Sequence, residues 1–381
     1  MNQQLSSFAA RLRELIVSGF QGENFDELAV ELFVLQFEHN AAYKKLCDLR
    51  KVTPSTVCVI RGMTPSFAGR WTQIPFMPTG GFKAMEVSSI PAAERTAVFH
   101  SSGTTELTPS RHFHNSKSLA VYEASLWKWF QFRFGRTGDL VFLTPSPGAA
   151  PRSSLVYMFE TLRQMFGLPE PAFTGYVSAD GSWTVDFAAT TQPLQIAADT
   201  GKPLTLLGTA FSFVHLLDYL VENNLRFELP NGSRVMETGG YKNRSRTMPK
   251  SELHALITKQ LGITPDNIIC EYGMSELSSQ AYAVTNDQWQ ETRDYEASGH
   301  LSPVTGHFLF PPWARIQIIS PETGREVAEG ETGLIRVFDL ANVFSVAAIQ
   351  TEDLGIRRGD GFELIGRAQL AEPRGCSLMT V

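Results

Sequence analysis

Apolar residues recur with helical spacing in three stretches of the first third of the chain. Residues 1–20 place two arginines and a glutamate among apolar positions, which is typical of an amphipathic helix. Residues 24–46 repeat leucines on one face, and Asn24 or Asp26 can cap the first turn. Residues 116–134 gather Leu and aromatic side chains near one face. We therefore expect a helix over each of these stretches.

Further along, short apolar runs alternate with helical patterns. Strands are predicted at 96–99, 140–144, 204–208 and 268–271, and helices at 212–223 and 250–261. Beyond Trp313 the pattern changes to strands separated by turns, at 314–319, 333–338 and 362–365. The predicted fold class is α/β. It consists of a layered α/β body with a β-rich C-terminal subdomain, which forms an appended sheet or a small barrel.

Composition and charge mainly argue against certain classes of protein and certain kinds of site. The chain has 381 residues, a formal net charge of −6 and only 19% charged residues, which argues against a nucleic-acid binder. Its apolar runs are shorter than the ~18 residues of a membrane helix, and residues 1–20 do not resemble a signal peptide. Cys47, Cys58, Cys270 and Cys376 include no CxxC pair. We therefore expect no disulfide framework, no zinc site and a cytoplasmic location.

The segment 101–111 concentrates hydroxyl groups between a predicted strand and a predicted helix. Its core consists of Ser101, Ser102, Gly103, Thr104 and Thr105. Glycine allows close backbone approach, and N–H groups with hydroxyls can surround phosphate oxygens. Arg111 adds a bidentate phosphate donor. The GxxxxGK[ST] pattern is absent, so the candidate is a phosphate loop of another kind, or else a polar surface turn.

A second candidate, 271–276, follows the predicted strand 268–271. Gly273 permits a tight turn, and the ring of Tyr272 can stack on a base. Glu276 can hold Mg²⁺, which binds one or two carboxylates together with phosphate oxygens. Taken alone, this pattern also fits an ordinary turn at the end of a strand.

A third candidate lies in the β-rich segment. Asp353 can accept hydrogen bonds from ribose hydroxyls. Arg367, which follows Gly366, can reach a phosphate or a ribose. The alternative for this pair is a plain β-hairpin with a surface arginine.

In this order, the three segments resemble the motifs of the acyl-adenylate-forming superfamily, which includes acyl-CoA synthetases and luciferases. The resemblance implies that 101–105 holds the ATP phosphates, and that Tyr272, Gly273, Ser275 and Glu276 bind adenine and Mg²⁺. It also implies that Asp353 binds ribose, that Arg367 marks the hinge to a small C-terminal domain, and that Gly239 and Gly240 lie beside the adenine. The expected cofactors are therefore ATP and Mg²⁺.

Two departures from the superfamily pattern point to one branch. Glu106 replaces a glycine of the phosphate loop, and Arg111 stands near the place of a lysine. Only 14 residues follow Arg367, so the small domain and its lysine are not expected. In this respect the chain resembles acyl-protein synthetases of the LuxE type. Those enzymes pass a fatty acyl group from the adenylate to a C-terminal cysteine and then to an acyl reductase that makes an aldehyde.

This second resemblance implies a long-chain fatty acid as the substrate, an acyl reductase as the partner protein, and Cys376 as the acyl carrier. Cys376 is otherwise a small apolar residue of the tail. The expected division is 1–366 for the adenylate-forming domain and 367–381 for a short tail. Two alternatives remain: an adenylating enzyme for aromatic acids, of the phenazine type, and a non-catalytic relative that only binds an acid.

Overall fold

The computed structural model describes residues 2–58, 69–101, 108–135, 138–169, 172–239, 248–284 and 307–368, except for the side chain of Cys58. The helices are α1 (Gln3–Ser18), α2 (Phe25–His39), α3 (Ala41–Leu49), α4 (Pro54–Cys58), α5 (Gly81–Ala84), α6 (Ser116–Phe134), α7 (Ser154–Met165), α8 (Phe187–Thr200), α9 (Ala210–Glu222) and α10 (Lys250–Leu261), with short 3₁₀ turns at η1 (Arg70–Gln73), η2 (Ala92–Glu94) and η3 (Pro265–Asn267). The strands are β1 (Met77–Pro78), β2 (Ala97–His100), β3 (Arg111–His114), β4 (Asp139–Phe142), β5 (Gly175–Val177), β6 (Trp183–Val185), β7 (Leu204–Thr209), β8 (Arg234–Thr238), β9 (Ile268–Tyr272), β10 (Ala281–Val284), β11 (His307–Leu309), β12 (Ala314–Ile319), β13 (Thr332–Asp339), β14 (Ala348–Arg358) and β15 (Gly361–Arg367).

One sheet of 11 strands runs through the described part of the chain, in the order β12-β13-β14-β15-β11-β10-β9-β8-β7-β4, with β1 pairing beside β14. Strands β4, β7, β8 and β9 are parallel. From β9 onward through β10, β11 and β15 to β12 the pairing is antiparallel. The expected β-rich C-terminal segment is therefore an extension of this sheet and does not form a sheet or barrel of its own. Strand β10 lies between β9 and β11, so it joins the two halves into one ladder.

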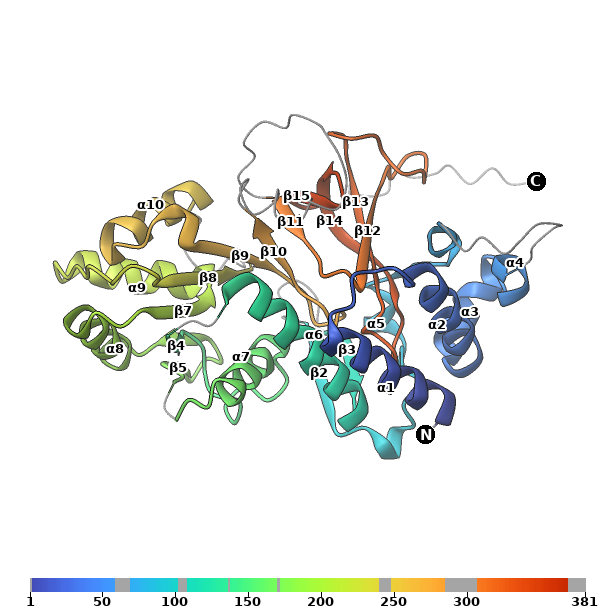
Figure 1. Cartoon of the computed structure of the whole chain (residues 1–381), viewed down its shortest axis with the longest axis horizontal. Coiled ribbons are helices and arrows are strands. Elements are labelled where there is room, and N and C mark those ends of the chain that lie inside the picture. The colour runs from blue at the N-terminus through green and yellow to red at the C-terminus, as the bar shows by residue number, and fades with distance from the viewer. Residues whose placement is uncertain are drawn as a thin grey trace.

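The parallel part of the sheet carries helices on both faces. Leu206 and Val235 belong to a core with α8, α9 and α10, whereas Leu207 and Met236 belong to a larger core with α1, α2, α6 and α7. Successive strand residues point to opposite faces, which explains why neighbours in sequence enter different cores. Figure 1 shows α8–α10 gathered at one end of the molecule and α1–α4 at the other. This arrangement is the predicted layered α/β body.

The stretch 24–46, predicted as one helix, is two helices that meet at Asn40. Asn40 has extended backbone angles, and its side-chain oxygen accepts a hydrogen bond of 3.0 Å from the N–H of Tyr43. It therefore caps α3. The expected cap of α2 is only partly right. Asn24 occupies the N-cap position but makes no side-chain cap, and Asp26 bonds instead to the N–H of Gly69 and to Arg315.

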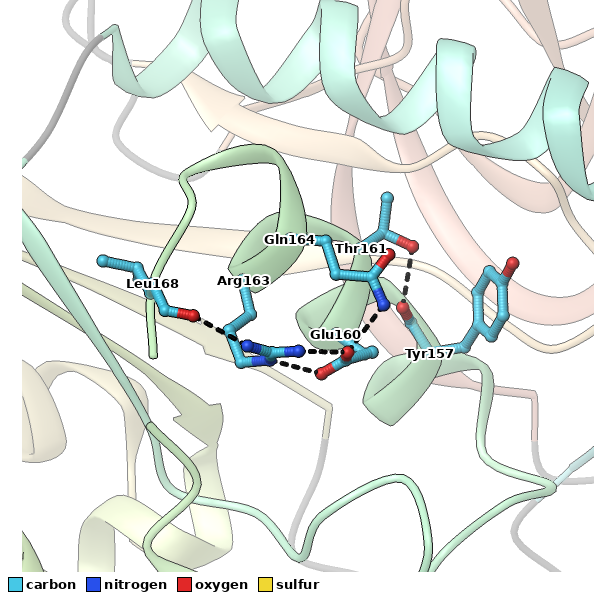
Figure 2. Close-up of polar contacts among 6 residues, drawn as sticks. All are labelled: Tyr157, Glu160, Thr161, Arg163, Gln164 and Leu168. Carbon is cyan, nitrogen blue, oxygen red and sulfur yellow. Dashed lines mark hydrogen bonds and ion pairs between the residues drawn. The ribbon is translucent and has the colours of Figure 1, made fainter. Parts of the chain in front are cut away.

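The end of α7 is fixed by a polar cluster on its own surface. The two oxygens of Glu160 accept hydrogen bonds of 2.7 Å from Arg163, and Gln164 donates to the same carboxylate. Arg163 also donates to the carbonyl of Leu168, three residues past the helix, as Figure 2 shows. Arg163 thus satisfies a carbonyl beyond the last turn and sets the direction in which the chain leaves α7.

Candidate active site

Two of the predicted motifs lie at the same edge of the sheet. Strands β8 and β9 are parallel neighbours with Thr238 opposite Glu271, so both end at this edge. Gly239 follows β8 with φ +75°, and Gly273 follows β9. In open α/β sheets, ligands bind outside the carboxyl ends of the strands, where these two turns lie.

Gly273 leaves room for the side chain of Glu271. A Cβ atom at this position would clash with Oε1 of Glu271. Glu271 itself is buried and accepts a hydrogen bond from the hydroxyl of Thr238. Burial raises the pKa of Glu271 to about 7, with a smaller contribution from the nearby carboxylate of Glu237. The sequence analysis included Glu271 in the second candidate segment but gave it no role; in the structure it connects the end of β8 to the turn after β9.

Three predicted site residues from distant segments lie together. The hydroxyl of Tyr272 donates to Oδ2 of Asp353 at 2.9 Å, and Nε of Arg367 lies 3.9 Å from Oδ1 of the same carboxylate. Asp353 and Arg367 are directly paired across β14 and β15. Burial raises the pKa of Asp353, while the Tyr272 hydroxyl and Arg367 partly offset this effect. The Arg367 side chain is 70% exposed, so it can turn toward a bound ligand.

The ring of Tyr272 is held by other aromatic side chains. It contacts the rings of Phe308, Phe310 and Phe362 nearly edge to face, at centroid distances of 6.1, 6.2 and 5.2 Å. Such contacts fix the ring plane. The orientation of this ring therefore depends on strands β11 and β15, which follow it in the sequence.

The turn that carries Glu276 is anchored from two directions. Nδ1 of His112, on β3, donates to the carbonyl of Ser275 at 2.9 Å. Nδ2 of Asn342 donates to the carbonyl of Glu276 at 2.8 Å. Burial lowers the pKa of His112 to about 4, so the ring is neutral at pH 7. His112 is a residue that the sequence analysis missed; its only local signal is its place next to Arg111.

The carboxylate of Glu276 fits a cation. It is 5% exposed, and within the described ranges its one hydrogen-bond partner is the Ser275 hydroxyl, at 2.9 Å. None of the described lysines or arginines forms an ion pair with it. A buried carboxylate without a positive partner is costly, and a bound Mg²⁺ would supply that charge.

The base of the predicted phosphate loop is closed by the β2–β3 hairpin. His100 pairs with Arg111, and the N–H of Ser110 donates to Oγ of Ser101 at 2.9 Å. Nε of Arg111 is buried and has no hydrogen-bond partner among the described residues, which fits an anion such as phosphate. Ser102, Gly103, Thr104, Thr105, Gly240 and Cys376 lie outside the described residues.

A family model described as "Acyl-protein synthetase, LuxE" matches residues 19–380. The chain belongs to the LuxE family of acyl-protein synthetases. It is therefore an enzyme of the ligase type, and the resemblance inferred from the motifs is confirmed.

Two similar proteins carry the name long-chain-fatty-acid–luciferin-component ligase. The one from Aliivibrio fischeri is 23% identical over 375 residues, which covers 94% of this chain and 88% of that protein. The one from Vibrio harveyi is 23% identical over 322 residues, which covers 80% of this chain and 76% of that protein. This LuxE-family chain thus aligns with them over most of their length.

Solved structures confirm the fold class. The open conformation of 2-hydroxyisobutyryl-CoA ligase has a TM-score of 0.60 at 12% identity and covers 91% of this chain and 74% of that one. The postadenylation state of the same ligase gives 0.60 at 13% identity, with 91% and 67% coverage. Within the described ranges, no helix combines the length and the apolar character that crossing a membrane would require.

Proposed function

We propose that this LuxE-family enzyme uses ATP to convert a long-chain fatty acid into an acyl-adenylate and then transfers the acyl group to a protein cysteine. Membership of the family and the names of the two relatives support the overall reaction. The observation that carries the proposal for this chain is the meeting of Tyr272, Asp353 and Arg367 at the end of β9. These groups offer an aromatic face, a hydroxyl acceptor and a cation within one site.

We assign the nucleotide contacts as follows. The hydroxyl loop 101–105 and Arg111 hold the phosphates, Gly239 and Gly240 lie beside the adenine with Tyr272, and Asp353 accepts the ribose hydroxyls. The Nε of Arg111, which has no partner among the described residues, and the half-buried Asp353 carboxylate support these roles.

In the first step, a carboxylate oxygen of the acid attacks the α-phosphorus of ATP, and pyrophosphate leaves. Arg111 and Arg367 would stabilise negative charge on the phosphates in the transition state. Glu276 would hold Mg²⁺, which supplies further positive charge there. His112 keeps the Glu276 turn in place through the carbonyl of Ser275.

In the second step, we propose that the thiolate of Cys376 attacks the acyl carbonyl carbon. A thioester forms, AMP leaves, and the thiol proton passes to solvent. Cys376 is nine residues beyond Arg367. An extended segment of that length spans up to ~30 Å, which is enough to return to the adenylate. On this proposal, 1–366 forms the adenylating unit and 367–381 the carrier segment, working in the cytoplasm with an acyl reductase as the acceptor.

Labelled fatty acid and ATP test this sequence of steps directly. The wild-type protein should acquire label that hydroxylamine removes, and Cys376→Ser should lose that label while still forming the acyl-adenylate. Cys47→Ser is the matched control, because Cys47 is a buried residue of α3, and it should label like wild type. Hydroxylamine-sensitive label that persists in Cys376→Ser would refute the carrier role of Cys376.

A further inference from the structure

A second group of metal-ligand side chains lies beneath the same edge of the sheet. Nε2 of His254, on α10, is 3.5 Å from Oε1 of Glu237 on β8 and 3.7 Å from Sγ of Cys270 on β9. The three ligand atoms all lie within 4.8 Å of one another. Glu237 and Cys270 are directly paired across the two parallel strands, so both side chains face α10.

The two separations from His254 fit a tetrahedral zinc site. Zinc binds sulfur at about 2.3 Å and nitrogen or oxygen at about 2.0–2.2 Å, so ligand atoms of one tetrahedron lie roughly 3.4–3.6 Å apart. The two distances from His254 are close to these values. Thiolate, imidazole and carboxylate are also the donor types that zinc accepts, and three protein ligands leave a fourth position for water.

The surroundings give a metal ion access from solvent, and they include a positive charge that the ion can replace. Glu237 and Cys270 are buried, while the side chain of His254 is 23% exposed, so the cluster opens to solvent along α10. Nζ of Lys250 now supplies the positive charge, 3.7 Å from Oε1 of Glu237. Lys250 is in the first turn of α10 and its side chain is 47% exposed, so the ammonium can move into water when a cation binds.

We propose that Glu237, His254 and Cys270 form a binding site for a zinc-like divalent transition metal, separate from the Glu276 site. Binding converts the Cys270 thiol to a thiolate, releases its proton to solvent and displaces the Lys250 ammonium. The ion links β8, β9 and α10 just before Gly239 and Tyr272. It therefore braces the strand ends that hold the nucleotide, a consequence that rests on the proposed function, whereas the metal site does not.

Cobalt binding to the full-length, reduced, metal-free protein tests the site, because a cobalt–thiolate bond gives a near-ultraviolet absorption band. Wild type should show this band, and Cys270→Ser should lose it. His254→Ala should weaken Zn²⁺ binding at least tenfold in a competition assay with a colorimetric chelator. Cys47→Ser and His215→Ala are the controls, because neither residue belongs to the cluster, and both should bind like wild type.

Lys250→Met separates a metal site from a simple ion pair. If Lys250 only competes with the metal, the variant should bind Zn²⁺ about tenfold more tightly and be stabilised by it against heat. A cluster that exists only to neutralise Glu237 predicts the opposite, a less stable variant that Zn²⁺ does not rescue. The proposal fails if wild type shows no cobalt–thiolate band, or if Cys270→Ser keeps the band at unchanged affinity. Neither result bears on the labelling experiment with fatty acid and ATP, so the metal site and the proposed function fail independently.

Discussion

At the scale of single residues, Asp353 gives the sharpest test of the nucleotide site. Its carboxylate is half-buried beside Tyr272 and Arg367, and on our assignment it accepts the ribose hydroxyls. Loss of hydrogen bonds to a charged group costs roughly 1.5–3 kcal/mol, so Asp353→Ala should weaken ATP binding by about 10- to 150-fold. Calorimetric titration measures this affinity. Asp360→Ala, in the exposed turn between β14 and β15, is the control; equal affinities in the two variants would remove Asp353 from the site.

Glu276 is the residue on which metal dependence should rest. Glu276→Gln keeps the shape and the hydrogen bond to Ser275 but removes the charge that we assign to Mg²⁺. We expect the rate of adenylation to fall at least tenfold, about 1.4 kcal/mol of barrier, and the Mg²⁺ concentration for half-maximal rate to rise. Glu222→Gln, exposed at the end of α9, serves as the control. An unchanged rate and Mg²⁺ dependence in folded Glu276→Gln would contradict the assignment.

The sequence predicted Tyr272, Asp353 and Arg367 because each has its own local motif, and their proximity followed only from the family resemblance. His112 and Glu271 could not be predicted in the same way. Their roles come from what packs against them: the carbonyl of Ser275 for His112, and Thr238 and Gly273 for Glu271. No spacing in the chain encodes such contacts between distant strands.

At the scale of elements, the turn after β9 depends on Gly273. Gly273→Ala would place a Cβ atom against the carboxylate of Glu271, which is buried and held by Thr238, so it cannot easily move away. Overpacking of this kind costs about 1–3 kcal/mol, so urea denaturation should show a lower free energy of unfolding. Gly148→Ala is the matched control, because its Cβ would meet no atom within 4 Å. Equal stability of the two variants would show that Glu271 moves aside freely.

Asp339, at the end of β13, should make the stability depend on pH. It accepts hydrogen bonds from the N–H groups of Ser278, Ser279 and Ala341 and from the Ser279 hydroxyl, but burial still raises its pKa from 3.8 to about 6. The folded state therefore binds this proton more tightly than the unfolded chain does. The resulting stabilisation is complete below pH 4 and is lost as the pH rises through 6, a change of about 3 kcal/mol.

Asp339→Asn tests this dependence, because asparagine does not titrate. The difference in free energy of unfolding between wild type and variant should shrink from pH 4.5 to pH 7. A difference that stays constant over this range would mean that the carboxylate has an ordinary pKa in the folded protein.

Element boundaries were predicted best where the local pattern was strong. Helix α10 and strand β12 have the predicted bounds, since Pro249 precedes the first and alternating apolar residues mark the second. The break at Asn40 was missed because helical spacing continues across it, although asparagine is a favoured cap. The single continuous sheet was missed because β10 and β11, each three or four residues long, give too short a pattern to detect.

At the scale of the whole molecule, the cysteines show that spacing along the chain does not reveal which side chains the fold brings together. Without a CxxC pair the sequence predicts no zinc site, yet the fold brings Cys270, His254 and Glu237 together from two strands and a helix. The family, by contrast, could be inferred from the sequence because its motifs keep their order along the chain, and residues 19–380 match it. The order of the motifs is visible in the sequence, whereas the contacts between them are not.

The central claim is that this LuxE-family enzyme activates a fatty acid with ATP. The most direct measurement is ATP–pyrophosphate exchange by the wild-type protein with Mg²⁺ and a panel of long-chain, short-chain and aromatic acids. We predict exchange that depends on a long-chain acid and falls at least tenfold in Glu276→Gln. Exchange supported only by aromatic acids would contradict the substrate, and no exchange with any acid would contradict ATP-dependent activation itself.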